Sequence, residues 1–91
     1  MHDGQATISP DILARYAGDA ACEVPGVAGL AGRRAVKVED THVEVHLVLH
    51  WGASIPEVGA AVQQRVREYL LRMAKLDPAA VDVVIDEVEA P

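Results

Sequence analysis

The sequence predicts an α+β fold, a two-layer sandwich in which two helices cover one face of a small mixed β-sheet. Apolar and polar residues alternate over residues 43–51, except that apolar Val48 takes an outward position, as in a half-buried strand. Elsewhere apolar residues recur at helical spacing. The predicted order is helix, strand, strand, helix, strand, over residues 10–23, 35–39, 43–51, 55–76 and 80–87. A short extra strand at residues 6–8 would precede them and is left open.

The first helix begins at Ser9-Pro10-Asp11, where Ser9 can cap, proline suits the first helical position and the aspartate faces the positive end of the dipole. It ends before Pro25-Gly26. Cys22, the single cysteine, cannot form an internal disulfide and is expected as a small core residue. The side chains expected to face the core are Ile12, Leu13, Tyr16, Ala17, Ala20 and Val24.

Residues 26–34 contain three glycines and are interpreted as a flexible connection. Gly26-Val27-Ala28-Gly29 also spells the GxxG of RNA-binding KH domains, so a KH-like nucleic-acid binder is one alternative. In those domains the loop joins two helices among cations. Here it precedes a strand in an acidic chain, which argues against that alternative.

The two middle strands form a hairpin around Asp40-Thr41, in which Val38 faces Val43 and Val36 faces Val45. The long strand turns an apolar side inward, expected to extend to Trp51, and an imidazole-rich side outward. The second helix begins with a capping box, Ser54 to Glu57. Its expected buried stripe is Val58, Val62, Val66, Tyr69, Leu70 and Met73. The last strand should follow a right-handed crossover and lie parallel to the long strand.

The 91 residues suffice for one domain, expected over residues 6–89 after a disordered N-terminus at residues 1–5. A formal charge of −6 argues against binding to nucleic acid or anionic lipid, because phosphate contacts need clustered cations. No apolar run approaches the ~20 residues of a membrane span. The chain is therefore expected in the cytoplasm, without direct membrane insertion.

The outer face of the predicted sheet is the candidate interaction surface. It comprises Lys37, Glu39, His42, Glu44, His46, Val48, His50, Asp82, Val84 and Asp86. Residues two apart on a strand lie about 6.5–7 Å apart, so the three histidines alone cannot share one ion. His46 and His50 are the best metal candidates if a neighbouring strand or subunit adds a carboxylate, and a metal-responsive protein is the second alternative. Imidazoles beside carboxylates titrate near neutrality, so association through this face should depend on pH.

Covalent catalysis finds no support in the sequence. Both serines and both threonines lie at expected caps, turns or the N-terminal lead-in. No cofactor and no enzymatic activity are expected.

Several segments together resemble the alkaline-shock-protein family of Gram-positive bacteria, the envelope stress response proteins. They are Ile8-Ser9-Pro10, Glu23-Val24-Pro25-Gly26-Val27, Trp51-Gly52, Ser54-Ile55-Pro56-Glu57-Val58, Val62-Gln63, Val66 and Val81-Asp82-Val83. The resemblance implies a non-enzymatic cytoplasmic protein linked to envelope stress. It also implies self-association into a homo-oligomer, or attachment to a membrane-embedded partner protein. The family has no agreed catalytic residues, so none is carried over.

Overall fold

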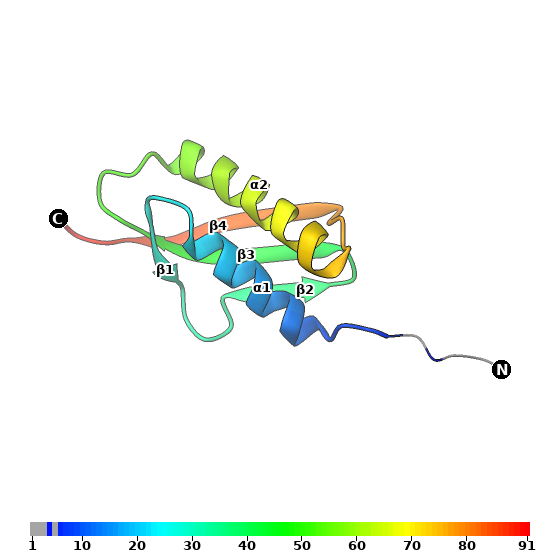
Figure 1. Cartoon of the computed structure of the whole chain (residues 1–91). Helices are drawn as coiled ribbons and strands as arrows, with labels where there is room; N and C mark the ends of the chain where they lie inside the picture. The colour runs from blue at the N-terminus through cyan, green and yellow to red at the C-terminus, as the bar shows by residue number, and fades with distance from the viewer. Residues whose placement is uncertain (1–3, 5) are drawn as a thin grey trace.

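The computed structural model describes residue 4 and residues 6–91, and forms a single sheet with two helices (Figure 1). The elements are α1 (Pro10–Cys22), β1 (Val27–Leu30), β2 (Val36–Glu39), β3 (His42–Leu49), α2 (Ile55–Ala74) and β4 (Ala80–Val88). The prediction of a disordered segment at residues 1–5 falls, apart from Gly4, outside the described residues.

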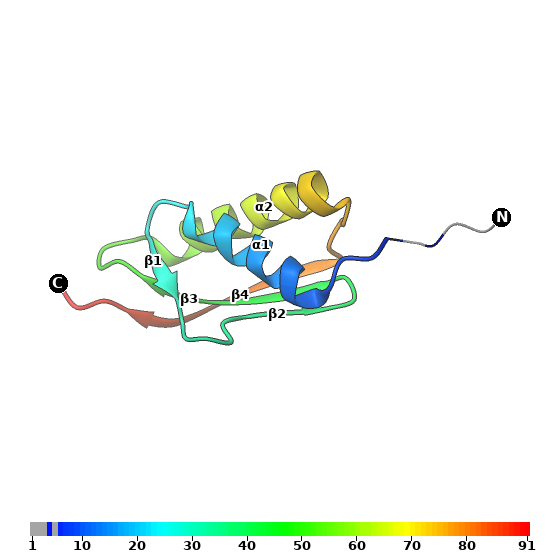
Figure 2. The same ribbon diagram turned by 60° about the horizontal axis from the view of Figure 1, so that its bottom comes forward.

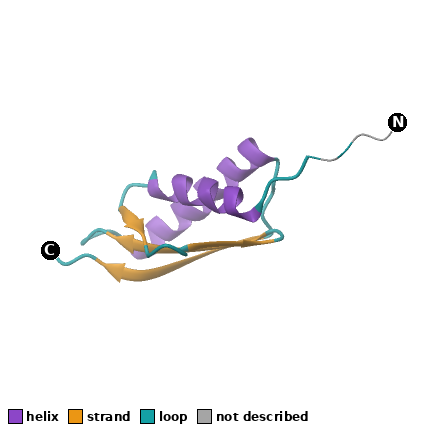
Figure 3. Ribbon diagram, turned by 90° about the horizontal axis from the view of Figure 1, so that it is seen from below, coloured by secondary structure: helices purple, strands orange, loops and turns teal. Residues whose placement is uncertain are grey.

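The α+β fold class is confirmed, with both helices packed on the same face of the sheet (Figures 2 and 3). β3 is the central strand. β4 lies parallel to it along its whole length, which confirms the predicted parallel crossover. β1 and β2 follow one another along the other edge of β3, both antiparallel to it. The sheet is therefore mixed and three strands wide.

The hairpin between β2 and β3 has the predicted register. Val36 pairs with Val45, and Val38 pairs with Val43. The two-residue turn is possible because Asp40 adopts a φ of 51°, in the left-handed region that Asp tolerates better than most residues.

The segment between α1 and β2 is more ordered than the sequence predicts. Val27–Leu30 is a strand, with Val27 paired to Leu49 and Leu30 to Leu47, so the prediction of a flexible connection is wrong there. Its sequence, VAGL, has no alternation to reveal it. Residues 6–8 form no strand, so that alternative is also wrong.

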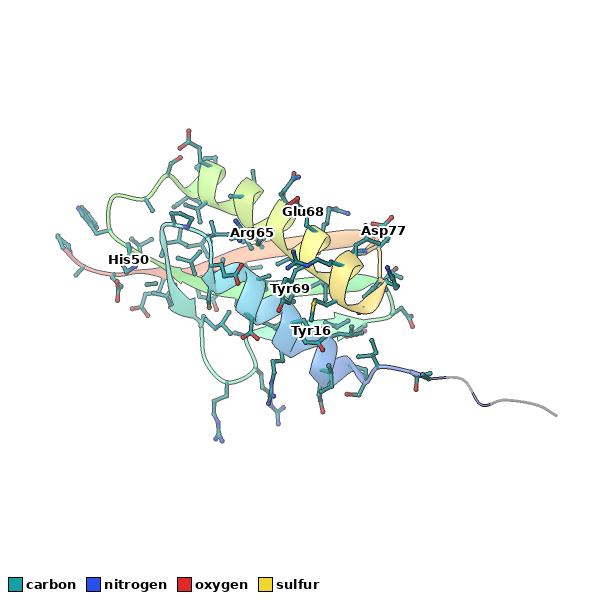
Figure 4. The ribbon with its side chains drawn as sticks, viewed as in Figure 1. Tyr16, His50, Arg65, Glu68, Tyr69 and Asp77 are labelled. Carbon is teal, nitrogen blue, oxygen red and sulfur yellow. The ribbon has the colours of Figure 1, made fainter. Side chains whose placement is uncertain are left out.

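The core lies between the sheet and the helices. Val43, Val45, Leu47 and Leu49 are completely buried, and α2 covers them with a stripe that includes Val62 and Leu70. The Tyr16 and Tyr69 rings meet edge to face between the helices, with centroids 5.8 Å apart (Figure 4). α1 packs closely because it contributes small buried residues: Ala17, Gly18, Ala20 and Ala21.

Five expectations at the ends of elements are wrong. Trp51 is 64% exposed because β3 ends at Leu49 and the tryptophan lies in the turn that follows. Ile12 and Met73 lie on exposed sides of the helices, and Cys22 is exposed at the last turn of α1. Ser54 is the N-cap of α2, but its side chain makes no capping hydrogen bond.

Candidate functional site

The outer face of the sheet is not covered by either helix (Figure 2). The burial pattern of β3 places the polar side chains of this strand on that face. Residues of β3 alternate strictly between buried and less buried positions, so the histidines and Glu44 lie opposite the core. The structure brings most of the predicted surface together, because β2 and β4 flank β3 along this face.

Three histidines on this face each contact a carboxylate from β4 or just beyond it. The distances are 2.6 Å for His42 Nε2 to Asp82 Oδ2, 3.0 Å for His46 Nδ1 to Asp86 Oδ1, and 2.9 Å for His50 Nδ1 to Glu89 Oε1. Asp82 and Asp86 each lie two residues further along β4 than the residue paired in register with the histidine, Ala80 for His42 and Val84 for His46. We call these contacts the imidazole–carboxylate row.

Glu89 is a member of this row that the sequence did not indicate. The register between β3 and β4 shifts after Leu47, so that Val48 pairs with Glu87 and Leu49 with Val88. This bulge carries the end of β4 alongside His50 and places the Glu89 carboxylate within reach. No local pattern reports such a shift, because it arises from pairing between distant segments.

His46 lies at the middle of the row and differs from the other two histidines. Its Nε2 is 2.7 Å from Glu44 Oε2, while its Nδ1 faces Asp86. Ionised carboxylates only accept hydrogen bonds, and only the imidazolium donates from both nitrogens. The hydrogen bonds to Glu44, and then to Asp86, therefore raise the pKa of His46 above its ordinary value.

The same geometry opposes metal binding by this chain alone. Glu44 and Asp86 lie on opposite sides of the His46 ring, one at each nitrogen, so they cannot share one ion with a single imidazole nitrogen. Within residues 4 and 6–91, no group of three or more His, Cys, Asp and Glu side chains is arranged to hold a metal. His46 and His50 are engaged with carboxylates instead.

Beside the row, the β2–β3 hairpin forms a polar hollow of about 440 Å³. Its lining residues are Lys37, Glu39, Asp40, His42 and Glu44. Lys37 and Glu44 are cross-strand partners, as predicted, and the Glu44 carboxylate contacts His46. Val48 and Val84 add apolar surface further along, and Val84 is 38% exposed.

The GxxG sequence is not in the setting that a KH domain needs. Gly26 lies in the turn after α1, and Val27–Gly29 belongs to β1. The glycine at position 26 has a structural role, with a φ of 100° and only 2.8 Å between an added Cβ and a Val58 methyl.

Comparison with known proteins identifies the family. Residues 33–90, more than half of the chain, match the model of the alkaline shock protein 23 family, which is described by its cell envelope-related function. The chain belongs to the alkaline shock protein family. This confirms the resemblance seen in the sequence.

Relatives of this alkaline shock protein family member span nearly its whole length. The uncharacterised protein YqhY of Bacillus subtilis is 32% identical over 92% of this chain and 76% of its own length. The uncharacterised protein Spy1614 of Streptococcus pyogenes is 28% identical over 96% of this chain and 89% of its own.

Solved structures with a similar fold include variants of MamM-CTD. One of them, MamM-CTD H264A, has a TM-score of 0.55 and 15% identity over 87% of this chain and 98% of its own. Another, a cadmium form of MamM CTD H285D, gives the same TM-score over 87% of this chain and 96% of its own. At this identity the likeness concerns the fold.

Neither helix of this alkaline shock protein family member is long and apolar enough to cross a bilayer, as judged over the described residues. Partial burial, and then the nearby Asp19, raise the pKa of the Cys22 thiol, which lowers its thiolate fraction at neutral pH.

Proposed function

We propose that this chain is a non-enzymatic docking module of the cell-envelope stress response. In this proposal it acts in the cytoplasm and receives a protein partner, such as a membrane-embedded anchor, on the outer face of its sheet. The observation that carries the proposal is the imidazole–carboxylate row on a sheet face that neither α1 nor α2 covers. The family's cell envelope-related description supports the cellular setting.

The composition of the face suits a partner that binds reversibly. Predicted members of the surface include charged groups at both ends and two valines, Val48 and Val84, between them. Interfaces that form and dissociate combine a small apolar centre with a polar, hydrated rim. A permanent interface would be more apolar than this face.

The face is a poor candidate for catalysis. The serines at positions 9 and 54 are the N-caps of the two helices, and neither is hydrogen-bonded to a histidine of the row in the described residues. The His46 imidazole is flanked by two acceptors rather than by a nucleophile that it could activate. The proposal therefore assigns these side chains to recognition.

Protonation should tune the docking. An imidazolium at His46 neutralises part of the negative charge contributed by Glu44 and Asp86, and this balance changes as the group titrates. A partner that buries the row will bind with an affinity that depends on pH. An association constant that stays flat between about pH 5.5 and about pH 8 would contradict this part of the proposal.

The experiment is affinity capture from the native host followed by measurement with the purified partner. The face variant combines His46→Ala with Val48→Lys, and the matched control is Gln64→Lys on the exposed side of α2. We expect the wild type and the control to retain the same partner and the face variant to lose it. Equal retention by all three proteins would overturn the assignment of this face.

A further inference from the structure

A groove runs between α1 and β2, on the helix-covered side of the sheet and away from the imidazole–carboxylate row. α1 lies over β2 at this edge, whereas α2 packs toward β4 (Figure 1). The groove has a volume of about 670 Å³, within the range of ~300–1,000 Å³ typical of pockets that hold small molecules. Its lining comes from α1, from the end of β1, from the turn that follows β1, and from β2.

One side of the groove is cationic. Arg33 and Arg34 lie in the turn between β1 and β2, and both are exposed. Neither they nor Arg15 on α1 form an ion pair with a carboxylate in the described part of the chain. The α1 side also carries Asp11 and Asp19, so its two carboxylates outnumber its one guanidinium group. Positive charge is therefore concentrated at the turn, where an anionic group would be stabilised.

The free edge of β2 adds backbone donors beside this turn. His46 N donates to Ala35 O at 2.8 Å, and hydrogen-bonded positions alternate along an antiparallel ladder. The backbone groups of Val36 and Val38 therefore point away from β3, and no strand in the described residues pairs with them. Backbone N–H groups and guanidinium groups both form strong hydrogen bonds to anionic oxygens.

The rest of the lining is largely apolar. Ala14, Gly18, Leu30 and Val36 contribute to it, and Leu30 is 37% exposed. Gly18 allows Leu30 to lie close to α1, because a Cβ at position 18 would come within 3.1 Å of Leu30 Cδ1. Small-molecule sites combine apolar walls with a few polar groups that fix the orientation of the ligand. This lining matches a molecule that joins an apolar part to an anionic group.

We propose that the groove binds a small organic phosphate, a molecule in which a phosphate monoester is attached to an apolar body. The phosphate lies against Arg33 and Arg34, whose guanidinium groups can each donate two parallel hydrogen bonds, and the apolar body lies against Leu30. Lys37 also lines the groove and adds to its positive charge. A phosphate monoester fits better than a carboxylate because it carries a charge of about −1.5 to −2 at pH 7. This site goes beyond the proposed docking function and is independent of the outer face.

The charge distribution favours a free molecule over a lipid in a bilayer. A membrane surface would bring anionic headgroups against both sides of the groove, including the side that carries Asp11 and Asp19. The net charge of −6 also opposes the approach of the whole chain to an anionic membrane. A single molecule needs only the cationic side and the apolar lining.

The test is calorimetric titration of the whole chain with hexyl phosphate. Inorganic phosphate and 1-hexanol each supply one half of this probe. The groove variant combines Arg33→Gln with Arg34→Gln. The matched control combines Arg72→Gln with Lys75→Gln, which removes the same charge from two exposed residues that do not line the groove. Circular dichroism checks that both variants retain the fold.

We expect hexyl phosphate to bind the wild type and the control saturably, with one molecule per chain. Binding of hexyl phosphate to the groove variant, and of either half-probe to the wild type, should be at least about tenfold weaker. In nuclear magnetic resonance spectra of the wild type, hexyl phosphate should shift the methyl signals of Leu30 and Val36 and leave those of Val48 and Val84 unchanged.

Several results would overturn the proposal. They are the absence of saturable binding, equal affinity for inorganic phosphate, equal weakening in the control, and methyl shifts on the outer face instead of in the groove. Sedimentation with vesicles that contain phosphatidic acid separates the two sources of phosphate. Binding to these vesicles without binding to hexyl phosphate would assign the groove to a membrane surface and overturn the assignment to a free molecule.

Discussion

Truncating Leu47 to alanine tests the division of β3 into a buried side and a docking side. Leu47 is completely buried between the sheet and the helices, so the substitution removes apolar contacts and leaves a cavity. Such changes cost about 2–5 kcal/mol. A domain of 91 residues has a total stability of about 5–14 kcal/mol, so a large fraction would be lost.

Val48→Ala is the matched control, one residue further along the same strand and on the outer face. Its side chain packs against no helix, so we expect a loss below about 1 kcal/mol. Urea unfolding followed by far-ultraviolet circular dichroism measures both. In thermal unfolding, Leu47→Ala should lower the Tm by about 10 °C or more, since ~1 kcal/mol corresponds to ~4–8 °C at this size. Equal losses for the two variants would refute the assignment of the two faces.

Three further predictions concern single sites. Because the pKa of His46 is raised in the folded state, its ion pairs contribute fully to the free energy of unfolding below about pH 6.5, and this contribution is lost as pH rises through the folded-state pKa. In urea titrations at increasing pH, His46→Gln should remove the corresponding decline in stability. An unchanged decline in the variant would contradict this prediction. Gly26→Ala should cost about 1–3 kcal/mol, because φ is 100° and the new methyl group would meet Val58; a neutral result would show that the turn can relax. Ser9→Ala should cost about 1 kcal/mol of stability, because Ser9 Oγ accepts a hydrogen bond from the α1 backbone. Ser54→Ala should cost less, because the Ser54 side chain makes no cap hydrogen bond. Thermal unfolding of the two variants measures both losses, and a larger loss for Ser54→Ala would contradict the assignment.

Much of the candidate site could be predicted because it lies on one strand. Alternation in β3 places His42, Glu44 and His46 on one face whatever lies beside the strand. Which carboxylate each imidazole meets depends on the register with β4, a segment about 40 residues away. The contact of His50 with Glu89 needs, in addition, the bulge in β4, so no reading of either segment alone could have located it.

The sequence by itself determined the helices, the hairpin register and the two faces of β3, because these follow from periodicity and short-range turn chemistry. Only the tertiary structure decided that Val27–Leu30 is a strand, since its glycine and alanine carry no alternation and its order comes from pairing with β3. It likewise decided that Trp51 is exposed and that the Glu89 carboxylate meets His50. Neighbouring strands in this sheet come from segments that are distant in sequence, so no local stretch of residues determines which strands pair.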